Sequence, residues 1–420
     1  MKILIKQVTI ADNNSTHNKQ EKDILIEDGI VKRIDHQIEE EAEIFQGKNY
    51  FISPGWVDVF SHGCDPGYEH KETLETLAAA AVAGGYTQVF VLPNTNPAVQ
   101  SKAQVEYIVQ KSKSLPVNIH PLGALSKNIE GKELAEMYDM RNSGAIAFTD
   151  GTQPVQTAGL LLKALQYVKA FDGVVIQIPL DKSIGTNGLM NEGIVSTRLG
   201  LPGTPAMAEE IMVARDIKLS RYTESKLHFT GVSSAKSLEY IMRGKEGGIQ
   251  VTCSVAPYHL FFCDEDLETY DTHLKVNPPL RSRNDMMALR DAVLKGYVDC
   301  IASHHIPQDW DSKTCEFEYA KNGMIGLQTA YATIQTILPS LSAEKIASLF
   351  STNARKIFGL NEIIIEEGNA AEFTLFSTKS KTVFTADNNK SRSSNSPFIN
   401  TALNGYVAGV ISKGKIILNK

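Results

Sequence analysis

Short apolar runs with strand character alternate with segments of helical spacing between residues 56 and 303, and this alternation limits the folds open to the chain. The strand-like runs are 56–62, 87–92, 117–122, 144–149, 173–178, 226–232, 249–255 and 298–303, and helical spacing marks 71–84, 155–170, 205–219 and 284–296. Strands that alternate with helices predict a parallel sheet covered by helices. Eight such units over about 250 residues predict an α/β fold of the (β/α)₈ TIM barrel type. An open doubly wound sheet would usually have fewer strands and a Gly-x-Gly-x-x-Gly turn, which the sequence lacks.

The two ends of the chain differ from the middle. Residues 2–10 and 23–35 have strand character with a tight turn at Asp28-Gly29, and residues 371–376 and 405–418 repeat this pattern around Lys413-Gly414. We therefore predict one small β-domain built from both ends. The expected boundaries are 1–53 and 361–420 for its two parts and 54–360 for the barrel.

Composition excludes several classes of partner. The net charge of −6 argues against a nucleic acid or an anionic membrane surface, because no basic excess exists to neutralise phosphates. The sequence has no apolar run of about 18 residues, the length that would predict a membrane span. Its first residues are too polar for a signal peptide. The five cysteines are odd in number and scattered, which favours reduced thiols and a cytoplasmic protein.

Chemistry in a barrel enzyme sits at the carboxyl ends of the strands, so the motifs there carry the most information. They read PGWVDVFSHGCDPG at 54–67, AFTDG at 147–151, VVIQIPLD at 174–181, HFTGVSS at 228–234 and IASHHIPQ at 301–308. The runs PNTNP at 93–97 and VNPPLR at 276–281 complete the pattern. From about residue 50 to residue 400 the chain resembles the dihydroorotase branch of the amidohydrolase superfamily.

The resemblance implies a metal site, but most of its ligands are missing. Phe60, Ile178 and Gly231 stand at positions where the family has metal-binding histidines, and neither a phenyl ring nor an aliphatic chain can ligate zinc. His62 and Asp150 are the candidate ligands that remain. Each also has a structural interpretation, His62 as a hydrogen-bonded residue at a strand end and Asp150 as the cap of a loop or helix.

The substrate and catalytic positions are also altered. Cys64 takes the place of the arginine that binds substrate in the family, and His304 takes the place of the aspartate that acts as general acid and base. Asn94 and Asn277 stand at positions where the resemblance implies contacts with the substrate. Leu180, beside Ile178, replaces a glutamate, so we expect a filled, dry interior where the family has a hydrated metal pocket.

Three hypotheses follow from this pattern. The loss of ligands from an intact frame favours a non-catalytic dihydroorotase-like protein with no cofactor. Some bacterial aspartate transcarbamoylases depend on an inactive dihydroorotase-like partner, and resemblance to that partner implies a structural role in pyrimidine biosynthesis. We also expect the chain to form a homo-oligomer. The alternative is an active zinc-dependent cyclic amidohydrolase with a rebuilt mononuclear site at His62, Asp150 and His304, with His259 and His305 as further candidate ligands. A third hypothesis is a binding module that holds a small amide or carboxylate through Asn94 and Asn277.

Overall fold

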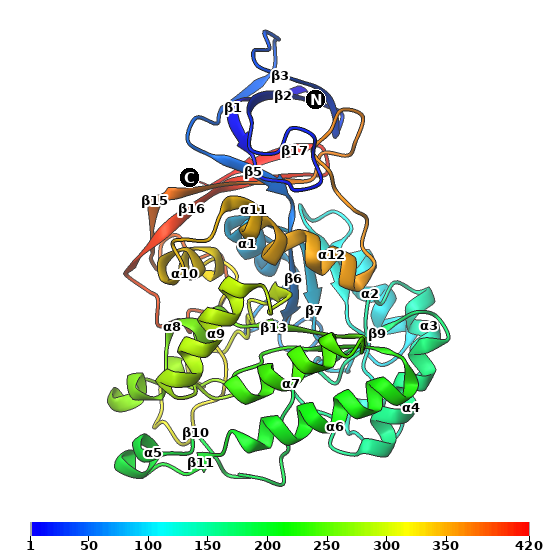
Figure 1. The fold of residues 1–420 in the computed structure, drawn as a ribbon, viewed down its shortest axis with the longest axis vertical. Helices are drawn as coiled ribbons and strands as arrows, with labels where there is room; N and C mark the ends of the chain where they lie inside the picture. The colour runs from blue at the N-terminus through cyan, green and yellow to red at the C-terminus, as the bar shows by residue number, and fades with distance from the viewer. Residues whose placement is uncertain (1, 420) are drawn as a thin grey trace.

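A computed structural model describes residues 2–419 and places a closed parallel barrel at the centre of the protein (Figure 1). Its strands are β6 (Trp56–Ser61), β7 (Tyr86–Val91), β8 (Asn118–Pro121), β9 (Val174–Gln177), β12 (Lys226–Phe229), β13 (Val251–Val255) and β14 (Cys300–Ile301). They form two parallel sheets, β6-β7-β8 and β9-β12-β13-β14. Parallel bridges from Phe148 to Gly123 and Val175, and from His305 to Ser61, join the two sheets. The predicted (β/α)₈ fold is confirmed.

The fourth strand differs from its prediction. A strand was expected over 144–149, but only Phe148 bridges to its neighbours. The chain enters this segment through Gly144, at φ +115°, and leaves it where Asp150 turns back to residues 125 and 126. Phe148 still accepts a hydrogen bond from the Ile176 amide and donates one to Val174 O, so the barrel closes through one residue.

Helices surround the barrel, and several begin or end at residues whose chemistry fixes the boundary. They are α1 (Leu74–Gly84), α2 (Lys102–Ser112), α3 (Met137–Asn142), α4 (Ala158–Lys169), α5 (Ile194–Leu199), α6 (Met207–Thr223), α7 (Ala235–Glu246), α8 (Pro257–Phe261), α9 (Arg283–Lys295), α10 (Ala330–Ile337), α11 (Ala343–Ala347) and α12 (Asn353–Phe358). Thr73 caps α1 by accepting from the Thr76 amide. Gly85 ends α1 at φ +89°, where a Cβ atom would lie 2.8 Å from the Trp56 ring.

Shorter elements connect these helices. They are β10 (Met190–Asn191) and β11 (Gly203–Thr204), the 3₁₀ turns Lys127–Ile129, Asp264–Thr269 and Thr272–Leu274, and a π-helix at Ser348–Thr352. The β10–β11 pair is parallel and lies between β9 and α6 in the sequence.

Both ends of the chain enter one sheet, shown above the barrel in Figure 1. Its strands are β1 (Lys2–Ile10), β2 (Glu21–Glu27), β3 (Ile30–Asp35), β4 (Glu43–Gln46), β5 (Phe51–Pro54), β15 (Phe373–Phe384), β16 (Thr401–Ser412) and β17 (Lys415–Leu418). The order is β17-β16-β15-β5-β1-β2-β3, with β4 also on β1. Both predicted hairpin turns have positive φ at their two central residues, 50° and 78° at Asp28-Gly29 and 49° and 74° at Lys413-Gly414.

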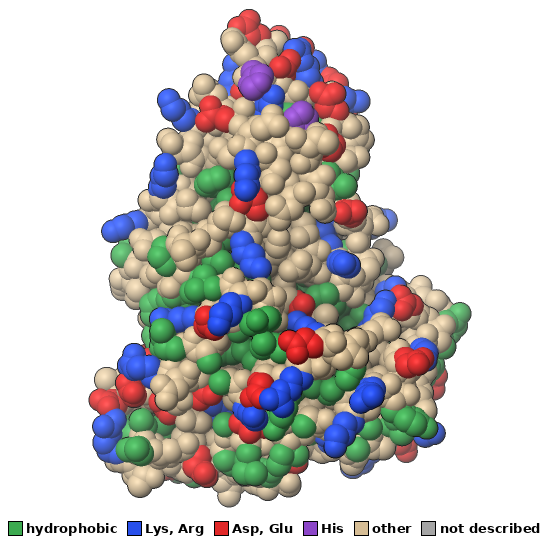
Figure 2. Space-filling view, viewed as in Figure 1, with side chains coloured by type: hydrophobic (Ala, Val, Ile, Leu, Met, Phe, Trp, Pro, Cys, Tyr) green, Lys and Arg blue, Asp and Glu red, His purple; other side chains and the backbone are tan. Residues whose placement is uncertain are grey.

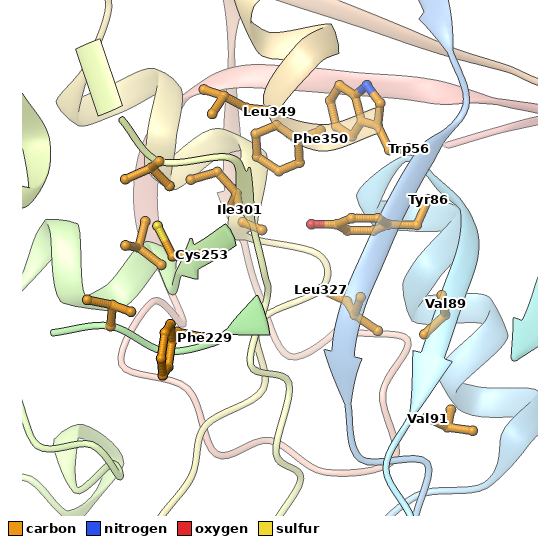
Figure 3. Close-up of a cluster of buried hydrophobic side chains, with 14 of the residues drawn as sticks. Trp56, Tyr86, Val89, Val91, Phe229, Cys253, Ile301, Leu327, Leu349 and Phe350 are labelled. Carbon is orange, nitrogen blue, oxygen red and sulfur yellow. The ribbon is translucent and has the colours of Figure 1, made fainter. Parts of the chain in front are cut away.

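An aromatic cluster around Trp56 joins this sheet to the barrel (Figure 3). The Trp56 ring centroid lies 4.9 Å from Phe350, 5.0 Å from Tyr331 and 5.4 Å from Phe376 of β15. The indole N–H donates to Ser53 Oγ at 3.0 Å, so the ring is fully buried without an unpaired polar atom. This cluster therefore packs the terminal sheet against the barrel, while Ile5, Ile24, Phe373 and their neighbours form a separate buried cluster within the sheet.

The surface carries charges of both signs. Figure 2 shows basic and acidic side chains interspersed on the face in view, with the visible histidines at the end of the molecule that carries the terminal sheet.

The five cysteines are free thiols, and all but Cys315 are buried. Within residues 2–419 no helix has both the length and the apolar composition needed to cross a membrane.

Candidate active site at the carboxyl end of the barrel

Two of the positions where the resemblance implied a metal-binding histidine, 60 and 231, meet at His304. Phe60, at the end of β6, is fully buried and its ring stacks on the His304 imidazole, with centroids 4.5 Å apart and planes 26° apart. Gly231 has φ +68°, and a Cβ atom there would lie 2.6 Å from Cε1 of His304. The His304 ring therefore occupies the space into which a side chain at 231 would project. The changes at 60, 231 and 304 form one packing unit.

Ile178, the third such position, is part of the apolar barrel interior. Its side chain is 1% exposed and belongs to the same buried cluster as Phe60. Other members are Val59, Phe90, Leu92, Leu122, Ile176, Ala302 and Phe358. The barrel interior around Phe60 and Ile178 is filled with hydrocarbon, as expected, whereas Leu180 is half-buried and lies outside this cluster.

A chain of hydrogen bonds runs through the barrel to His304. His304 Nε2 lies 2.8 Å from Thr230 Oγ1, which accepts from Ser254 Oγ at 2.8 Å. Ser254 Oγ lies 3.0 Å from His228 Nε2, and His228 Nδ1 lies 2.8 Å from Thr252 Oγ1. Because the Ser254 hydroxyl donates to Thr230, its oxygen accepts from His228 Nε2, and the Nδ1 of the neutral His228 ring then accepts from Thr252. The Thr230 hydroxyl keeps its own proton to donate to His304 Nε2. We call this series the relay.

Burial keeps both imidazoles of the relay neutral. It lowers the pKa of His304 to about 3 and that of His228 to about 3, and the neighbouring cationic forms of His259 and Lys245 add to the effect. At pH 7 each ring therefore has one donor and one acceptor nitrogen, as the relay requires.

His62 has a structural environment. Its Nε2 donates to Asn94 O at 2.9 Å, and its Nδ1 lies 3.5 Å from the Cys64 thiol. Burial lowers the pKa of His62 to about 4 and raises the pKa of the Cys64 thiol well above its ordinary value. Cys64, where the resemblance implied an arginine, is thus a protonated, buried thiol rather than a charged group or an activated nucleophile.

Asp150 caps a loop. Its Oδ1 accepts from the Leu125 and Ser126 amides at 3.0 and 2.8 Å, and its Oδ2 accepts from Ser126 Oγ at 2.5 Å. The structure does not bring Asp150, His62 and His304 together as a ligand set. Among residues 2–419 no group of three or more His, Cys, Asp or Glu is arranged to hold a metal ion. The donors present do not fit a zinc site.

The two asparagines predicted to contact the substrate, Asn94 and Asn277, have different surroundings. Asn94 Nδ2 donates to Asp150 O at 3.1 Å and its Oδ1 accepts from the Thr152 amide at 3.2 Å, so its amide group is occupied within the protein. A Cβ atom on Gly151 would lie 1.7 Å from that Oδ1. Asn277 is half-buried and precedes the cis proline Pro278, whose Cδ is 3.3 Å from the place of a Cβ on Gly231.

The two further candidate histidines are held by the scaffold. His259 Nε2 donates to Pro278 O at 2.9 Å, and burial lowers its pKa to about 4. His305 Nδ1 accepts from the Gly326 amide at 3.1 Å and its Nε2 donates to buried Glu72 at 3.2 Å. Both side chains position loops.

Comparison with known proteins identifies the family. The dihydroorotase of Acetivibrio thermocellus is 38% identical over 423 residues, which cover 100% of this chain and 99% of that protein. The chain belongs to the dihydroorotase family. The dihydroorotase of Caldicellulosiruptor saccharolyticus is also 38% identical, covering 99% of this chain and 98% of its own length. The family profile described as dihydro-orotase-like matches residues 49–237.

Solved structures support the same fold at greater distance. An L-hydantoinase (dihydropyrimidinase) from Arthrobacter aurescens superposes with a TM-score of 0.87 at 21% identity, covering 100% of this chain and 96% of that one. A D-hydantoinase has a TM-score of 0.85 at 19% identity, with coverage of 100% and 95%. The chain therefore has the complete fold of these solved structures.

The dihydroorotase motifs that survive have structural contacts. Arg281 is buried, and its Nη1 donates to Asn191 Oδ1 at 3.1 Å and to Thr204 O at 2.9 Å. Its Nη2 lies 3.6 Å from the buried Glu209 carboxylate, which also accepts from the Ser233 amide. These contacts tie together the loops after β9, β12 and β13, independently of any metal.

Sequence reasoning missed the hydroxyls of the relay. Thr230, Ser254 and Thr252 are ordinary strand residues by themselves, and His228 had no assigned role. Their common signal was alternation, since 228 and 230, and 252 and 254, point to one face of neighbouring strands. The strand register that aligns His228 with Thr252 is visible only in the structure.

Proposed function

We propose that this member of the dihydroorotase family does not hydrolyse cyclic amides and acts as a structural partner of aspartate transcarbamoylase in pyrimidine biosynthesis. The observation that carries the proposal is the stack of Phe60 on His304. The two stacked rings fill the space in which the family's reaction needs a metal-bound hydroxide.

The chemistry of the site supports the first part. Hydrolysis of a cyclic amide needs an activated water and a group that moves a proton in the transition state. His304 is too weak a base for that role, because burial holds its pKa at about 3. Cys64 offers no charge to hold a carboxylate, whereas an arginine could bind it with two hydrogen bonds.

Interconversion of carbamoyl-aspartate and dihydroorotate tests this part. The purified protein is assayed with added zinc, beside the dihydroorotase of Acetivibrio thermocellus as a positive control. We expect no turnover above the uncatalysed background. Turnover that is lost in His304→Asn but kept in His70→Asn, an exposed histidine, would refute a non-catalytic role.

The second part is supported by the retained frame, because the fold is complete although the residues of the family's metal site that the resemblance implies are absent. Co-elution of the chain with the aspartate transcarbamoylase of the same organism on a sizing column tests it, and the same run reports the homo-oligomer that we also propose. We expect a mixed complex and a change in transcarbamoylase activity on mixing. Separate elution with unchanged activity would rule out the partnership.

The alternative of an active zinc-dependent hydrolase is favoured by one observation, the 38% full-length identity to proteins named dihydroorotase. Metal analysis after dialysis distinguishes the two. One equivalent of zinc, lost in His62→Ala or His304→Ala, would support the alternative. Zinc below about a tenth of an equivalent supports the non-catalytic role, since family-type sites retain zinc through three or four protein ligands.

A further inference from the structure

A cavity of about 380 Å³ lies at the amino end of the barrel, opposite the candidate active site. It is bounded by the first residues of β9, β12 and β13 and by α12, which lies above β9 and β13 in Figure 1. Its volume is within the range of sites for small molecules. Catalytic groups of TIM barrels sit at the other end, so any ligand here would bind without reacting.

The cavity wall combines an apolar part with a cation. Val174, Val251 and Ile357 contribute hydrocarbon at the strand ends and on α12. Lys356, also on α12, is exposed at the rim, and within residues 2–419 its ammonium forms no ion pair. Such a wall fits a compact apolar body with an anionic group.

The other charged groups at the cavity are already matched. Lys226 pairs with Asp172 at 2.5 Å. Asp299 pairs with Lys245 at 2.5 Å and also accepts from the Cys253 amide at 2.6 Å. The charge left without an opposite partner in this lining is that of Lys356, and a ligand with one negative charge near it would balance it.

Thr252 links the cavity with the relay. Its side chain is half-buried, lines the cavity and donates to His228 Nδ1 at 2.8 Å. From His228 the hydrogen bonds continue through Ser254 and Thr230 to His304. A ligand that accepts from the Thr252 hydroxyl competes with His228 for that proton.

We propose that this cavity binds a small monoanion with an apolar body, such as a ring carboxylate, and that Thr252 connects the occupied cavity with the relay. The site is separate from the candidate active site and does not depend on whether the protein is catalytic. Binding weakens the Thr252–His228 hydrogen bond and alters the environment of both relay imidazoles.

Titration of the full-length protein, with isotope-labelled histidine, tests the proposal by NMR of the ring signals. The probe is benzoate, and benzamide is its neutral counterpart. We expect saturable shifts of the His228 and His304 signals with benzoate, and binding at least tenfold weaker for benzamide. The His304 signal is identified by its absence in His304→Asn.

Variants locate the site. Lys356→Gln should weaken benzoate binding at least tenfold, and because Lys356 is exposed this variant should fold normally. Lys163→Gln, an exposed lysine on α4, is the matched control and should bind as the wild type does. Thr252→Val should keep benzoate bound but remove the shift at His304.

Three results would overturn the proposal. One is the absence of a saturable shift at about 20 mM benzoate, a concentration that fills even a site of millimolar affinity. Another is equal benzoate affinity in the wild type and Lys356→Gln. The third is binding that leaves the relay signals of the wild type unmoved, which would refute the link through Thr252.

Discussion

Replacing His304 with asparagine should make the protein less sensitive to acid, although it should weaken the protein at neutral pH. Asparagine tolerates the left-handed backbone that His304 adopts at φ 46°. At pH 7.5 we expect a loss of about 1–3 kcal/mol, because the ring contact with Phe60 and the hydrogen bond from Thr230 disappear.

The pH dependence follows from the lowered pKa of His304. Burial holds it at about 3 in the folded protein, against 6.5 for an ordinary histidine. Below pH 6.5 the unfolded chain therefore binds a proton that the folded protein does not, and stability falls as the pH falls toward 3. At pH 5 this costs the wild type about 2 kcal/mol, from 1.36 kcal/mol for each of the 1.5 pH units below 6.5. The variant has no such cost, so its deficit at pH 5 should shrink by about 2 kcal/mol.

Urea unfolding at pH 7.5 and pH 5 measures both deficits, with His70→Asn as the control for loss of an exposed imidazole. A deficit that is equal at the two pH values would refute the argument. A deficit that grows at pH 5 would mean that the folded protein favours a charged His304, as an acid catalyst would.

Three further changes test the site. Gly231→His introduces the residue that the resemblance implies at this position. It should lower the free energy of unfolding by more than about 3 kcal/mol, because residue 231 has a positive φ and a side chain there would clash with His304. Gly159→Ala, in open space, is the control and should leave the melting temperature unchanged. Asp150→Ala should cost about 2–4 kcal/mol in urea unfolding, because two buried amides and a hydroxyl lose their acceptor, and an unchanged midpoint would argue against the capping role. Cys64 should resist a thiol reagent in the folded protein and react fully in urea, since burial keeps it protonated, whereas rapid labelling of the folded protein would contradict this environment.

Local patterns in the sequence were sufficient for the architecture. Alternating strands and helices predicted the barrel, and the turns at Asp28-Gly29 and Lys413-Gly414 predicted hairpins that the structure contains. The range predicted for the fourth strand was too long, because an apolar run such as 144–149 does not reveal that the chain turns away on both sides of Phe148.

The candidate site was less predictable because its residues interact across strands. The resemblance implied that Phe60, Gly231 and His304 each replace a residue of the family's site, but not that side chains at the three positions compete for the same space. The relay needed the register of β12 against β13, which no local pattern supplies. Asp150 could be a ligand or a cap until the positions of the Leu125 and Ser126 amides were known.

The terminal sheet has a consequence for synthesis on the ribosome. β5 (Phe51–Pro54) pairs on one side with β1 and on the other with β15, which begins at Phe373. The nascent chain must therefore carry an unpaired, apolar strand edge while the whole barrel is made. Such an edge is a target for association with other chains. The fraction of newly made chains that reaches the native state would therefore depend on two events. One is protection of the first 54 residues by a chaperone, and the other is early closure of the barrel beside them.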